Sequence, residues 1–391
     1  MRLAFVVQRY GADIAGGSEA HCREIAERLA PRHDITVLTT CARDYVTWEN
    51  AAPAGTTVER GVRVTRFPVR HPRRLKRFAD ISDEVFDHDA PRHRQEEWFR
   101  ENGPDAPALL DYLAMHGREY DLVLFWTFRY APSFFGLPLV QERAVLLPTA
   151  EEDSAVRLSV LAGFFRAPAG YLFLTPEEEA LVSGRAGQPL HPSATIGIGL
   201  EPAPPAPDRA ALDRHGIPQE YVLYLGRVDR NKGCETLFDY FTTYAAQGNA
   251  TPLVLAGPAK MQIPSHPDIR ALGYVSDELR TALLAHTRAL VIPSPYESLS
   301  IVLLEAWNHA VPAIVNARCK VLDGQVRRAN GGLSYASATE FNESLRYLLS
   351  HPRERDAIGR QGREFIEREY RWPTVLARIE TLLEQVIARR V

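Results

Sequence analysis

Residues 1–29, MRLAFVVQRYGADIAGGSEAHCREIAERL, decide the fold class. The apolar run over 3–7 predicts a buried strand, and the pair Gly16-Gly17 lies in the polar turn that follows it. The apolar residues after this turn recur at helical spacing: Ala20, Ile25, Ala26 and Leu29. A strand, a glycine-rich turn and a helix in this order open a doubly wound α/β domain.

Short apolar runs continue to alternate with amphipathic segments, which predicts βαβ units on parallel sheets. In the first half of the chain, strands are expected over 3–7, 35–38, 62–67, 122–128, 145–147 and 171–174. Beyond residue 208, strands are expected over 221–225, 253–256, 290–292 and 313–315, and helices over 235–246, 277–285 and 301–309. The segment from residue 338 is expected to be helical, with breaks at Pro352 and Pro373.

A proline-rich stretch divides the chain. Residues 201–208, EPAPPAPD, can form neither a helix nor a central strand. We therefore predict a linker between two Rossmann-like domains, 1–200 and 201–371, because 391 residues exceed one ordinary core. The helix over 372–391 is expected to pack back toward the first domain. The two doubly wound domains are expected to face a central cleft at the carboxyl ends of their strands.

The composition is that of a soluble globular protein and excludes several classes. The 46 Lys and Arg residues are balanced by 49 Asp and Glu residues, so the chain has no overall attraction for nucleic acid. Its four cysteines lie far apart without a CxxC pair, which favours reduced thiols over a zinc knuckle or disulfides. The first apolar run is too short for a signal peptide, and no stretch predicts a membrane span. A cytoplasmic protein is expected.

Residues 225–233, LGRVDRNKG, place two cations on a turn between a strand and a helix. Arg227 follows the expected strand directly, and Lys232 stands just before the expected helix. A phosphate would meet the helix N-terminus at this point, where backbone N–H groups add partial positive charge. Taken alone, the turn fits a solvated loop equally well.

Residues 297–305, ESLSIVLLE, follow another expected strand and the turn over 293–296. Ser298 is expected to cap the helix, so that the first free amides face the cleft. Glu305 lies on the second helical turn among apolar residues and needs a partner there. Either sugar or ribose hydroxyls, or a buried arginine, would serve.

The GR-x4-KG turn followed by the Glu-x7-Glu element resembles glycosyltransferase family 4, the retaining group with the GT-B fold. Further landmarks of the family match over most of the chain, least over residues 70–120. These matches are the first-loop glycines Gly16 and Gly17, the strand-end glycines Gly226 and Gly257, and the base-binding segment with Tyr274 and Val275.

This resemblance implies a role for each matching residue. Arg227 and Lys232 neutralise the departing diphosphate, Glu305 takes the ribose hydroxyls, and Glu297 contacts the transferred sugar. Donor contacts are also implied for the residues between the two glutamates: Ser298, Leu299, Ser300 and Ile301.

The family's favoured mechanism is a front-face attack by the acceptor hydroxyl as the diphosphate departs. A phosphate oxygen takes the proton, so no protein nucleophile, metal or other cofactor is required. Side-chain cations supply the charge stabilisation that a metal would otherwise give. The implied partners are a nucleotide-sugar donor and a hydroxyl acceptor on a glycan, a lipid-linked carrier or a small metabolite.

The chain departs from the family where a histidine usually follows the strand that ends near residue 148. By context, Glu151 occupies that place, and an ionised carboxylate accepts hydrogen bonds without donating any. Glu151 either recognises a cationic acceptor such as an amino sugar, or is an acidic helix N-terminus placed favourably for the helix dipole. In the aromatic cluster over 125–130, most of which is expected to be core, Trp126 or Tyr130 is a candidate to stack on an acceptor sugar.

Two charged segments remain open to interpretation. The basic run over 70–77, RHPRRLKR, either meets anionic lipid or a phosphorylated acceptor, or is a solvated helical arm. The first interpretation would place the protein at the inner face of the cell membrane. Asp87-His88-Asp89 has the DxD form of a metal site, but it lies in a polar segment and not after an apolar strand, which disfavours that role.

Two other functions compete with sugar transfer. The departure at Glu151 is compatible with a catalytically altered homologue that acts as a binding partner. A non-hydrolysing nucleotide-sugar 2-epimerase has the same two-domain fold. It is expected to use Asp, Glu and His of the first domain and to lack the two charged motifs, so we rank it low.

Overall fold

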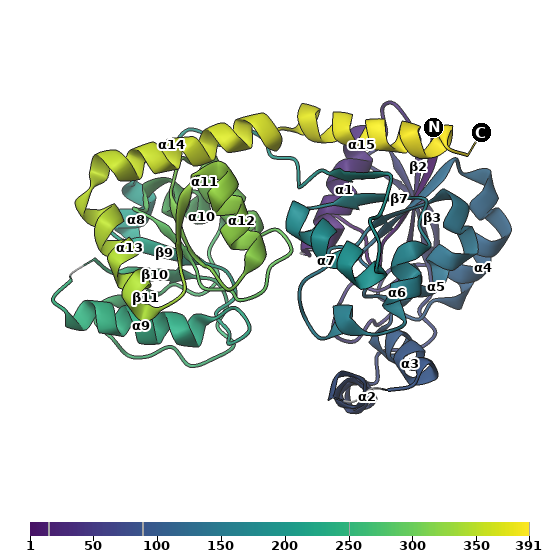
Figure 1. The fold of residues 1–391 in the computed structure, drawn as a ribbon, viewed down its shortest axis with the longest axis horizontal. Coiled ribbons are helices and arrows are strands. Elements are labelled where there is room, and N and C mark those ends of the chain that lie inside the picture. Colours follow the sequence, from purple (N-terminus) through teal and green to yellow (C-terminus); the bar gives the residue numbers. More distant parts are fainter. Residues whose placement is uncertain (15, 88–89, 250, 391) are drawn as a thin grey trace. The chain divides into compact units, whose positions relative to one another are not determined.

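The computed structural model describes residues 1–14, 16–87, 90–249 and 251–390. The chain divides into two compact units, which we call the N-terminal unit (Met1–Ile198 with Val375–Val391) and the C-terminal unit (Gly199–Thr374). Each unit has one sheet with helices packed around it (Figure 1), as the alternation of strand and helix patterns predicts.

The N-terminal unit contains an eight-stranded sheet with the order β3-β4-β2-β1-β5-β6-β7-β8. All neighbouring strands are parallel except the edge pair β3 and β4. The strand order runs outward in both directions from β1 and β5, which is the doubly wound arrangement. The strands are β1 (Arg2–Val6), β2 (Asp34–Thr40), β3 (Gly55–Glu59), β4 (Val62–Phe67), β5 (Leu122–Trp126), β6 (Ala144–Leu147), β7 (Gly170–Phe173) and β8 (Ser193–Thr195).

The two strands that the sequence did not predict, β3 and β8, lie at the edges of this sheet. Because edge strands expose their polar side chains, they lack the apolar run that marks a buried strand. The helices of the unit are α1 (Gly17–Leu29), α2 (Leu75–Asp87), α3 (Arg92–Asn102), α4 (Pro107–His116), α5 (Ala131–Gly136), α6 (Leu161–Arg166) and α7 (Pro176–Ala186). Three short 3-10 segments complete it: η1 (Gly117–Glu119), η2 (Leu137–Arg143) and η3 (Ala155–Arg157).

The C-terminal unit contains a six-stranded, fully parallel sheet with the order β11-β10-β9-β12-β13-β14. Its strands are β9 (Val222–Leu225), β10 (Leu253–Ala256), β11 (Ile269–Ala271), β12 (Leu290–Ile292), β13 (Ala313–Asn316) and β14 (Gly332–Tyr335). Its helices are α8 (Ala210–Arg214), α9 (Cys234–Ala246), α10 (Asp277–His286), α11 (Ile301–Asn308), α12 (Lys320–Ala329), α13 (Ala338–Ser350) and α14 (Pro352–Glu369). The edge strands β11 and β14 and the charged helices α8 and α12 were not predicted.

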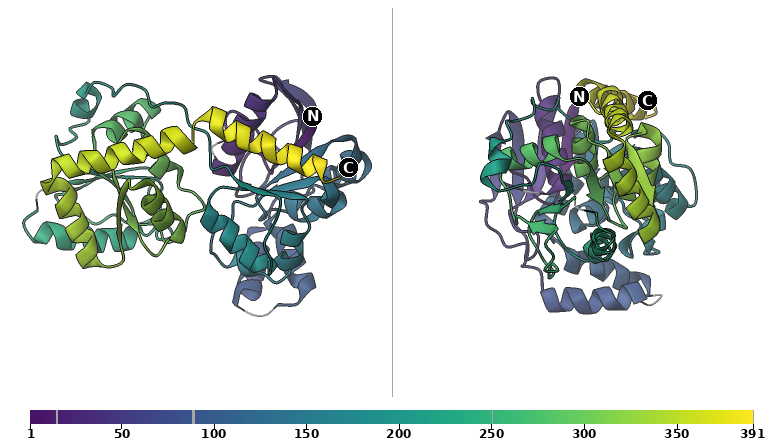
Figure 2. Two further views of the ribbon diagram at one scale, coloured as in Figure 1. Left: turned by 45° about the horizontal axis from the view of Figure 1, so that its top comes forward. Right: turned by 90° about the vertical axis from the view of Figure 1, so that its left-hand side faces the viewer.

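The proline positions have the expected effect on the chain. Residues 201–208 form neither helix nor strand, and separate helices begin at Pro352 and at Trp372, just before Pro373. The last helix, α15 (Trp372–Ala388), is the yellow helix that ends near the C-terminus in Figure 2. It enters the N-terminal unit at Val375, where Glu380 contacts His33 at 2.9 Å and Arg32 at 2.9 Å. Among the helices that the structure describes, none has both the length and the apolar character needed to cross a bilayer.

A buried carboxyl group joins the segments that follow two neighbouring strands of the N-terminal unit, β6 and β7. Glu178 of α7 accepts hydrogen bonds from the backbone N–H of Ala150 at 2.7 Å and of Leu174 at 2.5 Å. Burial raises the pKa of Glu178 to about 8, although these N–H groups oppose the shift; the negative charge of Glu151 adds to it. The pKa of Glu178 therefore depends on the position of the loop that carries Ala150 and Glu151.

We expect the Glu178→Gln variant to lose a pH-dependent part of the stability. The native chain holds this proton up to pH about 8, whereas the unfolded chain releases it near 4.5. The contribution of this proton to the unfolding free energy is complete below the unfolded-state pKa of 4.5. It is lost as the pH rises from there through the native-state pKa of about 8. Relative to E178Q, the unfolding free energy of the wild type should fall by about 1.4 kcal/mol per pH unit across that window. Urea unfolding at several pH values measures it, and parallel pH profiles would contradict a protonated Glu178.

Candidate active site

Two glycines let neighbouring strand ends of the C-terminal unit run close together. Gly226 follows β9 with φ 148°, and Gly257 follows β10 with φ 141°. A Cβ on Gly257 would lie 2.0 Å from the carbonyl oxygen of Gly226, so only glycine fits there. The N–H of Gly257 also donates to the carbonyl of Gly273 at 2.7 Å, which extends the contact to the segment after β11.

A third glycine brings the two charged motifs together. Gly233 precedes α9 with φ 74°, and a Cβ on it would lie 2.3 Å from the carbonyl oxygen of Pro293. Asn316, at the end of β13, donates its side-chain N–H to the same carbonyl at 2.9 Å. The start of α9 therefore lies directly against the segment that connects β12 to α11.

This contact places the expected cations beside the first glutamate of the Glu-x7-Glu element. The ammonium Nζ of Lys232 lies 2.8 Å from Oε1 of Glu297. Asp229 joins the two cations, because its carboxylate contacts the guanidinium of Arg227 and accepts the backbone N–H of Lys232 at 2.8 Å. Sequence reasoning missed Asp229, although an Asp three residues before Lys232 is a common turn signal.

The loop before α11 differs from the expectation. The helix begins at Ile301, and Ser300 is its N-cap, with φ 67° and no capping bond from its side chain. The prediction that Ser298 caps this helix was therefore wrong, whereas the expected helix start at Ile301 is confirmed. The first N–H groups of a helix lack partners within it, and at this end they follow Glu297 closely. Leu299 is buried, and its carbonyl accepts a hydrogen bond from Gln325.

Glu305 pairs with an arginine, the second of its two expected partners. Its carboxylate contacts Arg280 of α10, and the side chains are 22% and 32% exposed. The pair thus lies at the surface of the unit and not inside it. Tyr274 is 85% exposed and Val275 half-buried, so the segment after β11 is open to solvent.

In the N-terminal unit, a buried ion pair lies beneath the glycine-rich turn. Gly16 is the N-cap of α1, which begins at Gly17. A Cβ on Gly16 would lie 2.2 Å from a carboxylate oxygen of Glu19, and Glu19 pairs with Arg9 at 2.6 Å. The Arg9 guanidinium also donates to the carbonyl of Arg43 at 2.8 Å. No spacing rule in the sequence signals this pair.

Glu151 lies near a strained segment after β6. The threonines that follow β5 and β6, Thr127 and Thr149, have φ values of 60° and 47°, which are rare for β-branched residues and recur at functional sites. Glu151 is half-buried, and Asp153 next to it pairs with Arg129. Only the three-residue segment η3 follows, so the interpretation of Glu151 as a helix N-terminus was wrong.

Trp126 does not contact an acceptor. Its side chain is 0% exposed and packs against Phe5, with ring centroids 4.9 Å apart, and against His21 at 6.3 Å. The predicted stacking was wrong, because the last residue of β5 points into the core. Burial lowers the pKa of His21 to about 4, which keeps its imidazole neutral and structural.

Among the residues that the structure describes, neither Asp87 of the DxD sequence over 87–89 nor the four cysteines belong to a metal site. His88 and Asp89 of the DxD sequence lie outside the described residues. Elsewhere in the described chain, no three His, Cys, Asp or Glu side chains gather as metal ligands. The four cysteines are free thiols, and all are buried.

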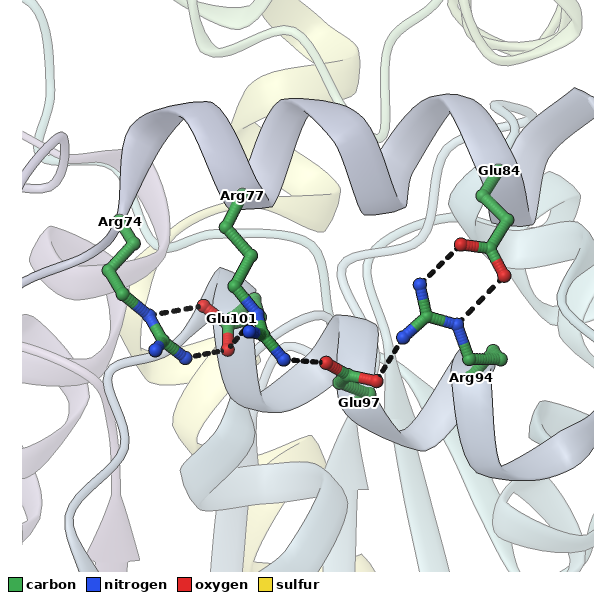
Figure 3. Close-up of polar contacts among 6 residues, drawn as sticks. All are labelled: Arg74, Arg77, Glu84, Arg94, Glu97 and Glu101. Atoms are coloured by element: carbon green, nitrogen blue, oxygen red, sulfur yellow. Dashed lines mark hydrogen bonds and ion pairs between the residues drawn. The ribbon is translucent and has the colours of Figure 1, made fainter.

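The basic run over 70–77 is largely neutralised inside the N-terminal unit. Arg74 and Arg77, on or beside α2, pair with Glu97 and Glu101 of α3 (Figure 3). Arg94 of α3 completes the network by contacting Glu84 and Glu97. The run is thus part of a helical arm held against α3, and Arg74, Arg77 and Arg94 all have carboxylate partners.

Comparison with known proteins supports a relation to sugar-transferring enzymes. Residues 211–365 match the family model described as glycosyl transferases group 1, and this region includes Arg227, Lys232, Glu297 and Glu305. The MMP alpha-(1->4)-mannosyltransferase of Mycolicibacterium hassiacum is 34% identical over 121 residues, which cover 29% of this chain and 28% of that protein. The chain thus aligns with under a third of that relative's length.

Solved structures match nearly the whole chain. Sucrose-phosphate synthase from Thermosynechococcus elongatus gives a TM-score of 0.72 at 18% identity and covers 99% of both chains. HepE from Anabaena, in complex with UDP and glucose, gives a TM-score of 0.69 at 14% identity, covering 98% of this chain and 100% of that one. These likenesses show that the chain has the GT-B fold.

We expect Gly233→Ala to lower the unfolding free energy by more than the left-handed backbone conformation at this position alone explains. An alanine there would need a left-handed φ, at a cost of roughly 1–2 kcal/mol, and would also meet the Pro293 carbonyl. The matched control is Gly248→Ala, because Gly248 has φ 84° but open space around its Cβ. Urea unfolding should show a clearly larger loss for G233A; equal losses would mean that the contact with Pro293 is unimportant.

Proposed function

We propose that this chain is a glycosyltransferase that moves a sugar from a nucleoside-diphosphate sugar to a hydroxyl acceptor, with retention of configuration and without a metal. The observation that carries this proposal is the 2.8 Å pair of Lys232 and Glu297 beside Arg227. All three residues lie in the region that matches glycosyl transferases group 1.

The departing diphosphate needs fixed positive charge, and the site supplies two cations. Lys232 is neutralised by Glu297, and its ammonium keeps further N–H donors for phosphate oxygens. A bound diphosphate would compete with Glu297 for Lys232 and free the carboxylate to accept hydrogen bonds from the sugar hydroxyls. The amides at the start of α11 would add partial positive charge. Glu305 would hold the ribose hydroxyls with the oxygen that does not contact Arg280.

The acceptor hydroxyl would attack from the face that the diphosphate leaves, and a phosphate oxygen would take its proton. No protein nucleophile is needed in such a step, which agrees with the absence of a candidate from the sequence motifs. The acceptor belongs to a glycan, a lipid-linked precursor or a small metabolite, and the protein works in the cytoplasm. The relative from Mycolicibacterium hassiacum is a mannosyltransferase and the neighbour from Thermosynechococcus elongatus is a synthase, so neither favours the epimerase or an inactive homologue.

The first test is release of nucleoside diphosphate from a panel of nucleotide-sugars. We expect Arg227→Met and Lys232→Met each to lower kcat/KM by about 10²–10³-fold, because each removes one fixed charge from the leaving group. Arg230→Met is the matched control: it lies on the same loop but pairs with Glu235 and is 76% exposed. An equal loss in R230M would indicate a general effect of loop charge, and no turnover of any donor would contradict the proposal.

Two further measurements address the finer parts of the proposal. Turnover should be unchanged by EDTA, since the cations replace a metal. NMR of the product should show the anomeric configuration of the donor. Loss of activity with EDTA would contradict the proposal that no metal is required. A product with inverted anomeric configuration would contradict the proposal of retention. Neither result would contradict sugar transfer itself.

Glu151 is proposed to contact the acceptor. We expect Glu151→Gln to raise the acceptor KM about ten-fold for an amino-sugar acceptor and little for a neutral one, because the variant removes an ionic hydrogen bond of roughly 1.5 kcal/mol. Steady-state kinetics with both acceptors measure this, and the exposed neighbour Glu152→Gln is the control. Unchanged donor and acceptor constants in E151Q would exclude a direct role.

A further inference from the structure

A cavity opens within the N-terminal unit, between α3, α5 and α6. Its volume is about 680 Å³, within the range of roughly 300–1,000 Å³ that ligand sites occupy. None of its lining residues belongs to the candidate active site. Those that matter for its chemistry are Arg92, Arg100, Arg166, Phe134, Phe135 and Phe164.

Helix α3 presents one stripe of side chains to this cavity and another to α2. Arg92, Glu96 and Arg100, four residues apart, line the cavity. The side chains of Glu97 and Glu101 contact the arginines of α2 instead (Figure 3). The ion pairs with α2 therefore fix the face of α3 that the cavity uses.

The opposite wall is joined to α3 through a buried amide. Gln95 is 3% exposed; it donates to the hydroxyl of Ser159 at 2.8 Å and accepts the backbone N–H of Val160 at 3.2 Å. The floor is aromatic: Phe134 stacks on Phe164, with ring centroids 5.6 Å apart. Walls and floor are thus held in place before any ligand binds, which lowers the entropic cost of binding.

The charge at the mouth is positive. Arg100 lies over the ring of Phe135, 4.2 Å from its centroid, and Arg166 donates to the carbonyl of Ala186 at 3.0 Å. Within the described part of the chain, neither guanidinium forms an ion pair with a carboxylate, whereas Arg92 pairs with Glu96 at 2.6 Å. Two guanidinium groups above an apolar floor complement an anionic head joined to an apolar chain.

We propose that this cavity binds the phosphate head and first chain segment of an anionic lipid at a membrane surface. A small soluble ligand would be mostly enclosed in its site. Here the rim is open: Arg100, Pro138 and Gly163 are exposed, and Leu139 beside them is 47% exposed. A lipid fits such an open cavity, because its head and first chain segment can lie inside while the end of its chain stays in the bilayer. The inference does not depend on sugar transfer, and it moves the membrane contact from residues 70–77 to this cavity.

The test is co-sedimentation of the full chain with phosphatidylcholine vesicles, with and without phosphatidic acid. We expect binding to the anionic vesicles only, and a roughly thirty-fold weaker apparent affinity for the R100Q/R166Q double variant. The control is R60Q/R118Q, which removes two exposed arginines of the same unit that do not line the cavity. Circular dichroism should show all variants folded.

A second pair of variants separates the cavity from surface charge. Gly163 lines the cavity on α6, Gly184 lies on α7 outside it, and an added Cβ meets nothing within 4 Å at either position. We expect Gly163→Leu to fill the mouth and weaken binding as far as R100Q/R166Q does, while Gly184→Leu binds like the wild type.

Each alternative outcome overturns the proposal. Full binding by G163L, or equal losses in the two arginine pairs, would show that surface charge and not the cavity attracts the vesicles. Glycerol 3-phosphate carries the same head without a chain; if it displaced the protein from vesicles at micromolar concentration, a free phosphate compound would be the ligand. Donor turnover of R100Q/R166Q without vesicles should equal that of the wild type, so failure here leaves the transferase proposal intact.

Discussion

The candidate site depends on the contact of Gly233 with the carbonyl of Pro293. Asn316 holds that carbonyl from a third strand end, and the missing side chain of Gly233 lets the start of α9 lie against it. Lys232 is thereby brought to 2.8 Å from Glu297, although the two lie far apart in the sequence. Any side chain at position 233 would push the start of α9 away from the Pro293 carbonyl and so separate Lys232 from Glu297.

Rigid backbone contacts surround this point, and the proposed function requires them, because charges that stabilise a leaving group must be in place beforehand. Gly257 leaves no room for a side chain against the carbonyl of Gly226, and Gly226 itself has a φ of 148° that favours glycine. Ser300 accepts a left-handed conformation just before α11. Asp229 fixes Arg227 and the backbone of Lys232 at once. Such strain is tolerable only where the surrounding sheet determines the conformation.

The N-terminal unit uses charge differently. Arg9 and Glu19 form a buried pair beneath the glycine-rich turn, so their role is to shape the loop and not to bind a ligand directly. The ion pairs between α2 and α3 likewise neutralise arginines of the basic run and hold these two helices together. Charges left without a carboxylate partner, such as Arg100 and Arg166, are then the better indicators of an anionic ligand.

The sequence by itself determined the doubly wound fold class and the positions of the buried strands, because apolar runs and glycine-rich turns are local patterns. It also singled out Arg227, Lys232, Glu297 and Glu305, since their order along the chain is informative. Only the tertiary structure decided which partners these charges have: Asp229 for Arg227, Arg280 for Glu305, and α3 for the basic run. It also placed Trp126 in the core and made Ser300, not Ser298, the N-cap of α11. Partner choice and burial depend on segments distant in the chain, and no local pattern contains that information.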